Sequence, residues 1–136
     1  RTMTRAGDVV IACGGGGIPV VKEADGSYRA VEAIIDKDFA SAKLAEELDA
    51  DMLIILTSVE KVKINMGRAD EKDLGEITVD QAKKYMEEGH FGVYNMLPKF
   101  KASVNFVEGR EGRSALITSY DKLKDALEGT TGTLIR

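Results

Sequence analysis

The sequence predicts an α/β fold in which a largely parallel sheet is covered by helices on both faces. Short apolar runs of four to six residues alternate along the chain with amphipathic segments long enough for helices. Strands joined through helices of this length form right-handed crossovers and lie parallel. The runs also lack a polar–apolar alternation, which indicates strands that are covered on both faces.

Length and composition indicate one globular domain without a membrane or nucleic-acid partner. The 136 residues are 43% hydrophobic and 31% charged, with a net charge of −4. Phosphate backbones are bound by basic surfaces, which this acidic chain does not suggest. No apolar run approaches the roughly 20 residues of a membrane span, and no signal peptide is visible. The single cysteine, Cys13, is expected in the core, with a reactive thiol as the alternative. A chain that can form no internal disulfide is expected in the cytoplasm.

Strands are expected at four apolar runs, residues 9–13, 31–35, 52–57 and 115–118. A hairpin with an Asp25-Gly26 turn is expected after the first of these strands. The polar, glycine-punctuated stretch 60–76 is expected to be a long irregular loop.

Helices are expected at residues 39–48, 78–89, 98–109 and 119–129. The first carries its apolar side chains on one side. Thr78 and Gln81 form a capping box at the start of the second, and Gly89 suits the left-handed position after its last turn. Pro98 fits the first turn of the third helix.

Four glycines follow the first expected strand, at the edge of the sheet where ligands of α/β proteins bind. Gly14, Gly15, Gly16 and Gly17 leave the backbone open to close approach, and their N–H groups suit phosphate or a small anion. The run matches neither GxGxxG nor GxxxxGK. A turn between tightly packed elements is the alternative.

The second expected strand ends in Asp36-Lys37-Asp38. Asp38 is expected to be the N-cap of the helix that follows. Lys37 then lies at a helix N-terminus, where a cation is disfavoured unless an anion binds there too, and Asp36 could hold the lysine in position. A solvated charge cluster is the alternative.

A second lysine, Lys99, falls in the first turn of the third expected helix. Two lysines at two helix N-termini, with a glycine loop, are suited to a multiply charged anion, as phosphoryl transfer requires. Both lysines are expected to contribute little to folding. No residues have metal-ligand spacing, and His90 is expected in a surface or cap role because it follows a helix-ending glycine.

Three motifs in order, GGGGIPV, VEAIIDKDFASAKLAEELDADMLIILT and NMLPK, resemble the carbamate kinases of the amino acid kinase family. The similarity runs from about Val9 to the C-terminal GTLI. It implies that residues 1–136 are the C-terminal, nucleotide-binding part of a longer chain whose N-terminal half is absent. It also implies a three-layer αβα sandwich with a mainly parallel sheet, and a homodimer.

The resemblance implies phosphate transfer between ATP or ADP and carbamate or carbamoyl phosphate, running towards ATP in arginine catabolism. Lys37 and Lys99 match the family's phosphate-contacting lysines in this half, and Asp36 matches the aspartate that orients active-site lysines. Magnesium would be carried by the nucleotide. The residues that match the family's nucleotide-binding positions are Gly14, Gly15, Gly16, Thr57, Ser58, Val62, Lys63, Asn65, Met96 and Pro98.

The chain departs from the family pattern at several of these places. Ser58 and Glu60 stand where aspartates are usual, Lys63 replaces a tyrosine, and Tyr94-Asn95 replaces a Gly-Ser pair. The N-terminal half would carry the carbamate-binding loops and a further lysine, so the chain alone is expected to be inactive. Another kinase of the same family and a non-catalytic nucleotide-binding or dimerising module are the alternatives.

Overall fold

A four-stranded mixed sheet forms the centre of the computed structural model, which describes all 136 residues. Its strand order is β5-β9-β10-β8. The parallel pair β5 (Met52–Thr57) and β9 (Ser114–Ser119) is in register over six residues. The strand β10 (Thr133–Ile135) runs antiparallel to β9 and parallel to β8 (Glu76–Ile77). The α/β prediction is confirmed, with one antiparallel pair inside the sheet.

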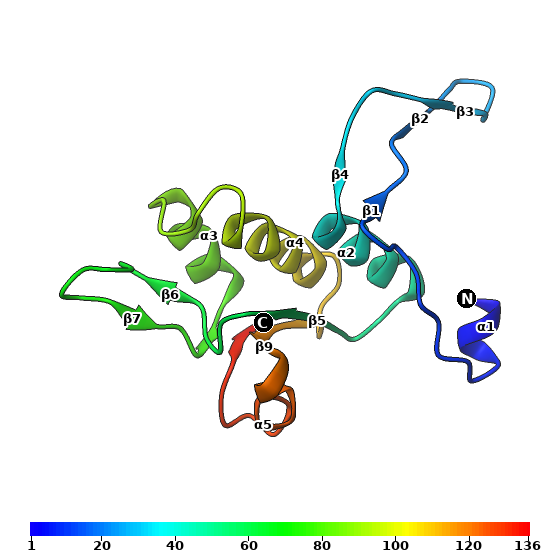
Figure 1. The fold of residues 1–136 in the computed structure, drawn as a ribbon. Helices are drawn as coiled ribbons and strands as arrows, with labels where there is room; N and C mark the ends of the chain where they lie inside the picture. The colour runs from blue at the N-terminus through cyan, green and yellow to red at the C-terminus, as the bar shows by residue number, and fades with distance from the viewer.

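Helices lie on both faces of this sheet (Figure 1). Three of them cover one face: α2 (Lys37–Leu48), α3 (Val79–Glu87) and α4 (Met96–Glu108). On the other face lies α5 (Leu123–Leu127), entered through the 3₁₀ turn η1 (Tyr120–Lys122). The expected three layers are therefore present.

The core lies between α4 and the sheet. Phe100 and Phe106 of α4 are completely buried, and they belong to the same apolar cluster as Leu53 and Ile55 of β5. Met52 and Ile54 alternate with these residues along β5 and remain 42% and 38% exposed. Successive side chains of a strand point to opposite faces. β5 is thus covered on one face, and the expectation that it would be covered on both is wrong.

Two of the four strand predictions are confirmed, by β5 and by β9. The other two fail. Residues 9–13 form no strand, Val9 and Ile11 are 96% and 99% exposed, and Cys13 is half-buried outside the core cluster. In the run 31–35 only Ile35 is in a strand, the two-residue β4 (Ile35–Asp36), paired with β1 (Gly16–Gly17).

The apolar runs near the N-terminus fail as strands because they have no neighbours. A strand is stable only where another strand satisfies its N–H and C=O groups and covers its side chains. No residue before Asp38 is buried, and Figure 1 shows this part of the chain, with the short helix α1 (Thr2–Arg5), extending away from the central sheet. An apolar run therefore does not by itself predict a strand where no other strand of this chain lies beside it.

Two hairpins project from the fold. β2 (Val20–Lys22) pairs with β3 (Tyr28–Ala30) around the expected Asp25-Gly26 turn, where the Ser27 N–H donates to the Asp25 carboxylate. β6 (Lys63–Ile64) pairs with β7 (Lys72–Asp73). The second hairpin lies inside the stretch 60–76, so the expectation of a wholly irregular loop is wrong.

The helix predictions are largely confirmed, with corrections at α2 and at the fourth expected helix. The Thr78–Gln81 capping box of α3 is present, and Gly89 has a φ of 75° after it. α4 ends at Gly109, with Pro98 in its first turn. Only residues 123–127 of the fourth expected helix are α-helical. The N-cap of α2 is Asp36 instead of Asp38, because the Asp36 carboxylate accepts from the Asp38 N–H at 2.7 Å.

Candidate functional site

The glycine loop lies against the start of α2. Gly16 is paired with Asp36, and a Cβ atom built on Gly16 would lie 2.2 Å from the Ile35 carbonyl oxygen. Any side chain there would push the two strands apart, so Gly16 has a packing role. Gly14 and Gly15 face open space, and Gly14 has a φ of 42° that favours glycine. These two glycines leave the backbone accessible beside the N-terminus of α2.

An ion pair joins the first turns of α2 and α4. Lys99 Nζ lies 2.8 Å from an Asp38 carboxylate oxygen, and the two side chains are only 11% and 9% exposed. The pair brings the N-termini of these two helices together. Helix N-termini present free N–H groups and partial positive charge, which suit an anion. Lys37, the first residue of α2, is exposed and forms no ion pair.

The carboxylate that holds a lysine is that of Asp38, which contacts Lys99, whereas the sequence predicted that Asp36 would hold Lys37. Asp36 forms an ion pair with neither lysine, because its carboxylate is used to cap α2. Asp38 lies two residues further along the chain, in the first turn of α2, where its side chain points towards α4 and reaches Lys99. Which of two aspartates flanking a lysine faces a second helix depends on packing, so the sequence could not distinguish them.

A pocket of about 200 Å³ adjoins the start of α4. It extends from the segment after β5 to the connection between α3 and α4. Met96, the first residue of α4, lines it and is three residues from Lys99, so the pocket and the paired helix N-termini are neighbours. Its lining residues are Val59, Lys61, Lys63, Met66, His90, Phe91, Gly92, Asn95 and Met96.

Of the residues matched to nucleotide binding in the run 57–65, only Lys63 lines this pocket. The Val62 side chain is buried in the core cluster, 1% exposed. Thr57 is buried at the end of β5, and Ser58 is exposed. Asn65 donates through its side-chain amide to the Asp70 carboxylate at 2.8 Å. In the NMLPK motif, Met96 lines the pocket, and Pro98, which is half-buried, does not.

Lys63 is held in the hairpin by two acidic side chains. Its Nζ lies 2.6 Å from Glu71 and 3.5 Å from Asp73. These contacts, with the Glu71 hydrogen bond first, raise the pKa of Lys63 above its ordinary value. The Gly67 N–H and then Lys63 lower the pKa of Glu71. The ammonium is therefore fixed and charged at the rim of the pocket.

His90 and Phe91 also line the pocket, and the sequence predicted neither residue there. The expected cap role of His90 is present in the backbone, since its N–H donates to the Tyr85 carbonyl at the end of α3. Its ring lies 3.0 Å from the Glu88 carboxylate and edge-on to Phe91, whose ring centroid is 4.3 Å from that of Phe100. The signal in the sequence is the aromatic pair His90-Phe91, three residues before the NMLPK motif.

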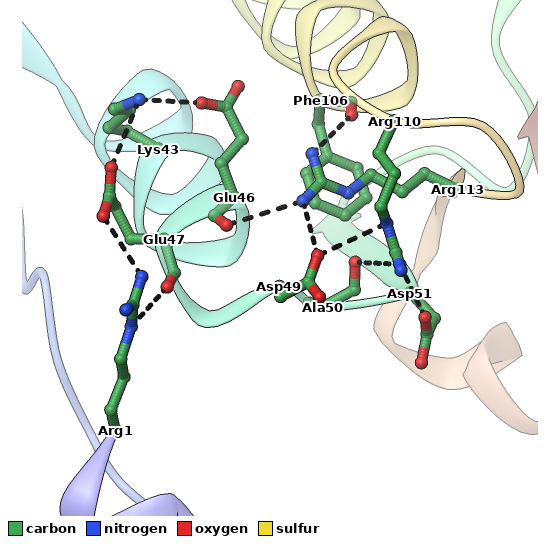
Figure 2. Close-up of polar contacts among 10 residues, drawn as sticks. All are labelled: Arg1, Lys43, Glu46, Glu47, Asp49, Ala50, Asp51, Phe106, Arg110 and Arg113. Atoms are coloured by element: carbon green, nitrogen blue, oxygen red, sulfur yellow. Dashed lines mark hydrogen bonds and ion pairs between the residues drawn. The ribbon is translucent and has the colours of Figure 1, made fainter.

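A second set of polar contacts fixes the opposite ends of α2 and α4 (Figure 2). Arg113 is buried and lies over the Phe106 ring, 4.8 Å from its centroid. Its guanidinium donates to the Phe106 and Glu46 carbonyls, at the ends of the two helices, and to the Asp49 carboxylate. The two helices are thus joined at their N-terminal ends by Asp38–Lys99 and at their C-terminal ends by Arg113, which fixes the geometry of the site.

The structure contains no group of three or more His, Cys, Asp or Glu side chains that could hold a metal ion. Among its helices, none has the length and apolarity needed to cross a bilayer.

Comparison with known proteins gives consistent matches in sequence. The sequence model of the amino acid kinase family matches residues 1–119. The chain is 52% identical over 135 residues to the carbamate kinase-like protein YqeA of Escherichia coli K12, covering 99% of this chain and 43% of that protein. It is 50% identical over 136 residues to the carbamate kinase of Staphylococcus haemolyticus, covering 44% of that protein.

Solved structures agree with the sequence matches. A Giardia carbamate kinase superposes with a TM-score of 0.88 at 38% identity, over 98% of this chain and 46% of its own. The Giardia lamblia carbamate kinase bound to AMP-PNP superposes with a TM-score of 0.80 at 40% identity. The match covers 89% of this chain and 42% of that enzyme. An isopentenyl phosphate kinase at 20% identity shares the fold alone, with a TM-score of 0.54. The chain spans less than half the length of the carbamate kinases it matches.

Proposed function

Because the chain belongs to the amino acid kinase family, we propose that it is the C-terminal, nucleotide-binding part of a carbamate kinase-like phosphotransferase. The observation that carries this proposal is the buried Asp38–Lys99 pair, which places two helix N-termini together beside the glycine loop. The names of the relatives at about half identity support carbamate as the acceptor rather than another substrate of the family.

In this proposal one adenine nucleotide spans two neighbouring parts of the site. Its phosphates lie at the N-termini of α2 and α4, near Lys37, Lys99 and the open backbone of Gly14 and Gly15. Its base and ribose occupy the pocket lined by Lys63 and Met96. The AMP-PNP complex of a relative supports nucleotide use. Magnesium is proposed to arrive with the nucleotide phosphates.

The proposed roles of the residues follow from their positions. Lys37 is exposed and carries no carboxylate partner, so its full charge is available to the oxygens of the transferring phosphoryl group. Lys99 supplies a second positive charge, and Asp38 fixes its direction in advance. Asp36 holds the start of α2 and so positions the Lys37 backbone. The protein contributes positioning and charge while the phosphoryl group moves between carbamoyl phosphate and ADP.

Three further parts of the proposal concern the whole protein. The carbamate side of the site is supplied by residues outside this chain, the kinase is a cytoplasmic homodimer, and it runs towards ATP in arginine catabolism. The exposed apolar residues of the N-terminal third, including Val9, Ile11 and Ile34, support association with further protein surface.

A non-catalytic nucleotide-binding module is the second candidate. Lys63 favours it, because this replacement of a family tyrosine is engaged by two carboxylates instead of offering a ring to a base. Both candidates bind nucleotide, and only the kinase transfers a phosphoryl group.

Amide hydrogen exchange tests the nucleotide site directly. We expect saturating ADP to slow exchange in residues 60–70, because the hairpin β6–β7 is paired only with itself and forms one wall of the pocket. The hairpin β2–β3 is the internal control and should not change. If exchange in residues 60–70 is the same with and without ADP, this segment is not part of a nucleotide site.

A further inference from the structure

Three threonine hydroxyls from the C-terminal part of the chain converge on the segment that follows β5. The Thr118 hydroxyl donates to the Glu60 carbonyl at 3.2 Å, and the Thr131 hydroxyl donates to the Glu60 carboxylate at 2.5 Å. The Thr133 hydroxyl accepts from the Val62 N–H at 2.9 Å. These contacts join residues 58 to 71 positions apart in the sequence.

Thr133 holds both arms of the hairpin β6–β7 at its base. Its hydroxyl accepts from Val62 and also donates to the Leu74 carbonyl at 2.6 Å. The two arms are themselves joined there, since the Leu74 N–H donates to the Val62 carbonyl at 2.7 Å. Thr133 is completely buried, and Val62 and Leu74 are 1% and 2% exposed. The hydroxyl therefore uses both its donor and its acceptor capacity in a place that water does not reach.

Apart from the side chains of Val62, Ile64 and Leu74, which are buried in the core cluster, strand pairing does little to fix the direction of the hairpin. β6 and β7 form a separate two-stranded sheet with two paired residues each, and no strand of the central sheet pairs with them. Lys63 and Met66, on this hairpin, form one wall of the pocket, while His90, Phe91 and Met96 form the other. The hydrogen bonds of β10 to Val62 and Leu74 therefore contribute to setting the distance between the two walls.

We propose that Thr133 is a positioning residue for the nucleotide base: its hydroxyl, assisted by Thr131, fixes the hairpin wall of the pocket at the spacing that the base requires. The inference rests on the proposed function, because it concerns the same pocket. Thr133 lines neither this pocket nor the paired helix N-termini, so it acts through the hairpin backbone.

The test compares ADP with inorganic tripolyphosphate as ligands of the chain, by calorimetry. Thr133→Val removes both hydrogen bonds at nearly constant volume. We expect it to raise the Kd for ADP by about tenfold, as for loss of a buried hydrogen bond, and to leave the Kd for tripolyphosphate unchanged. Thr133→Ser keeps the hydroxyl and should retain the affinity for ADP. Thr130→Val is the matched control, because the Thr130 hydroxyl contacts only the Asp125 carbonyl.

Each outcome of these binding measurements either supports or overturns the positioning role of Thr133. Unchanged ADP affinity in Thr133→Val, or an equal loss for ADP and tripolyphosphate, overturns the positioning role. If Thr133→Val does not fold, Thr131→Val provides the test: we expect weaker ADP binding at constant tripolyphosphate binding, and no change overturns the inference. If the unaltered chain binds no ADP, the proposed function itself fails, which the comparison of variants distinguishes from failure of the Thr133 role alone.

Discussion

Replacing Lys99 by methionine will lower the free energy of unfolding by roughly 3–5 kcal/mol, because it leaves a buried carboxylate without its partner. Asp38 is 8% exposed, and Lys99 is its only ion-pair partner. The sequence alone suggested that this lysine would matter little to folding, as for a charge at an open helix start. The burial of the Asp38–Lys99 pair argues against that expectation. Urea denaturation of the chain, followed by circular dichroism, measures the change.

Two further variants separate stability from function at this pair. Asp38→Asn combined with Lys99→Met removes both charges and should recover part of the lost stability, while the positive charge proposed to face the phosphates stays absent. Lys83→Met is the matched control, since the side chains of its pair with Glu108 are 45% and 42% exposed and solvent screens their interaction. A single Lys99→Met variant as stable as this control would contradict the structural role of the pair.

Replacing Lys37 by alanine will lower the rate of phosphoryl transfer by roughly 10²–10³-fold, the scale for losing one preorganised electrostatic contact. The free energy of unfolding of the Lys37→Ala variant should equal that of the parent, because Lys37 is exposed and has no ion-pair partner. The rate can be measured in a chimera in which this chain replaces the matching 44% of the Staphylococcus haemolyticus carbamate kinase.

Lys43→Ala is the control in the same helix. Lys43 is also exposed on α2 but lies more than a turn further on, paired with Glu46 at 3.0 Å. Its replacement should leave the rate within about twofold of the parent, as for a surface charge far from the reacting group. Retention of most activity by Lys37→Ala would remove the Asp36-Lys37-Asp38 segment from the proposed phosphate site.

The sequence predicted the parts of the fold whose neighbours lie in the same chain. β5 and β9 were found from their apolar runs, and each is the other's neighbour in the sheet. The capping box of α3 was found because it is local, with both partners within four residues. The run 9–13 has the same apolar character as β5, but no strand of this chain lies beside it. Composition alone could not show that difference.

The candidate site was predicted in part for similar reasons. The two lysines and the glycine loop were identified because helix starts and strand ends can be located from local sequence. The exchange of roles between Asp36 and Asp38 could not be predicted, since both residues can cap a helix and only packing against α4 decides which one reaches Lys99. Thr133 was overlooked because its partners, Val62 and Leu74, are distant in the sequence.

The most direct test of this account is to measure ADP binding and ATP formation from carbamoyl phosphate with the 136-residue chain and with the chimera. In-line transfer needs donor and acceptor held together, and that positioning contributes several kcal/mol to the barrier reduction. We expect the chain alone to bind ADP and to form no ATP, and we expect the chimera to do both. ATP formation by the chain alone, or failure of the chain to bind ADP, would contradict its assignment as the nucleotide-binding part of a carbamate kinase-like enzyme.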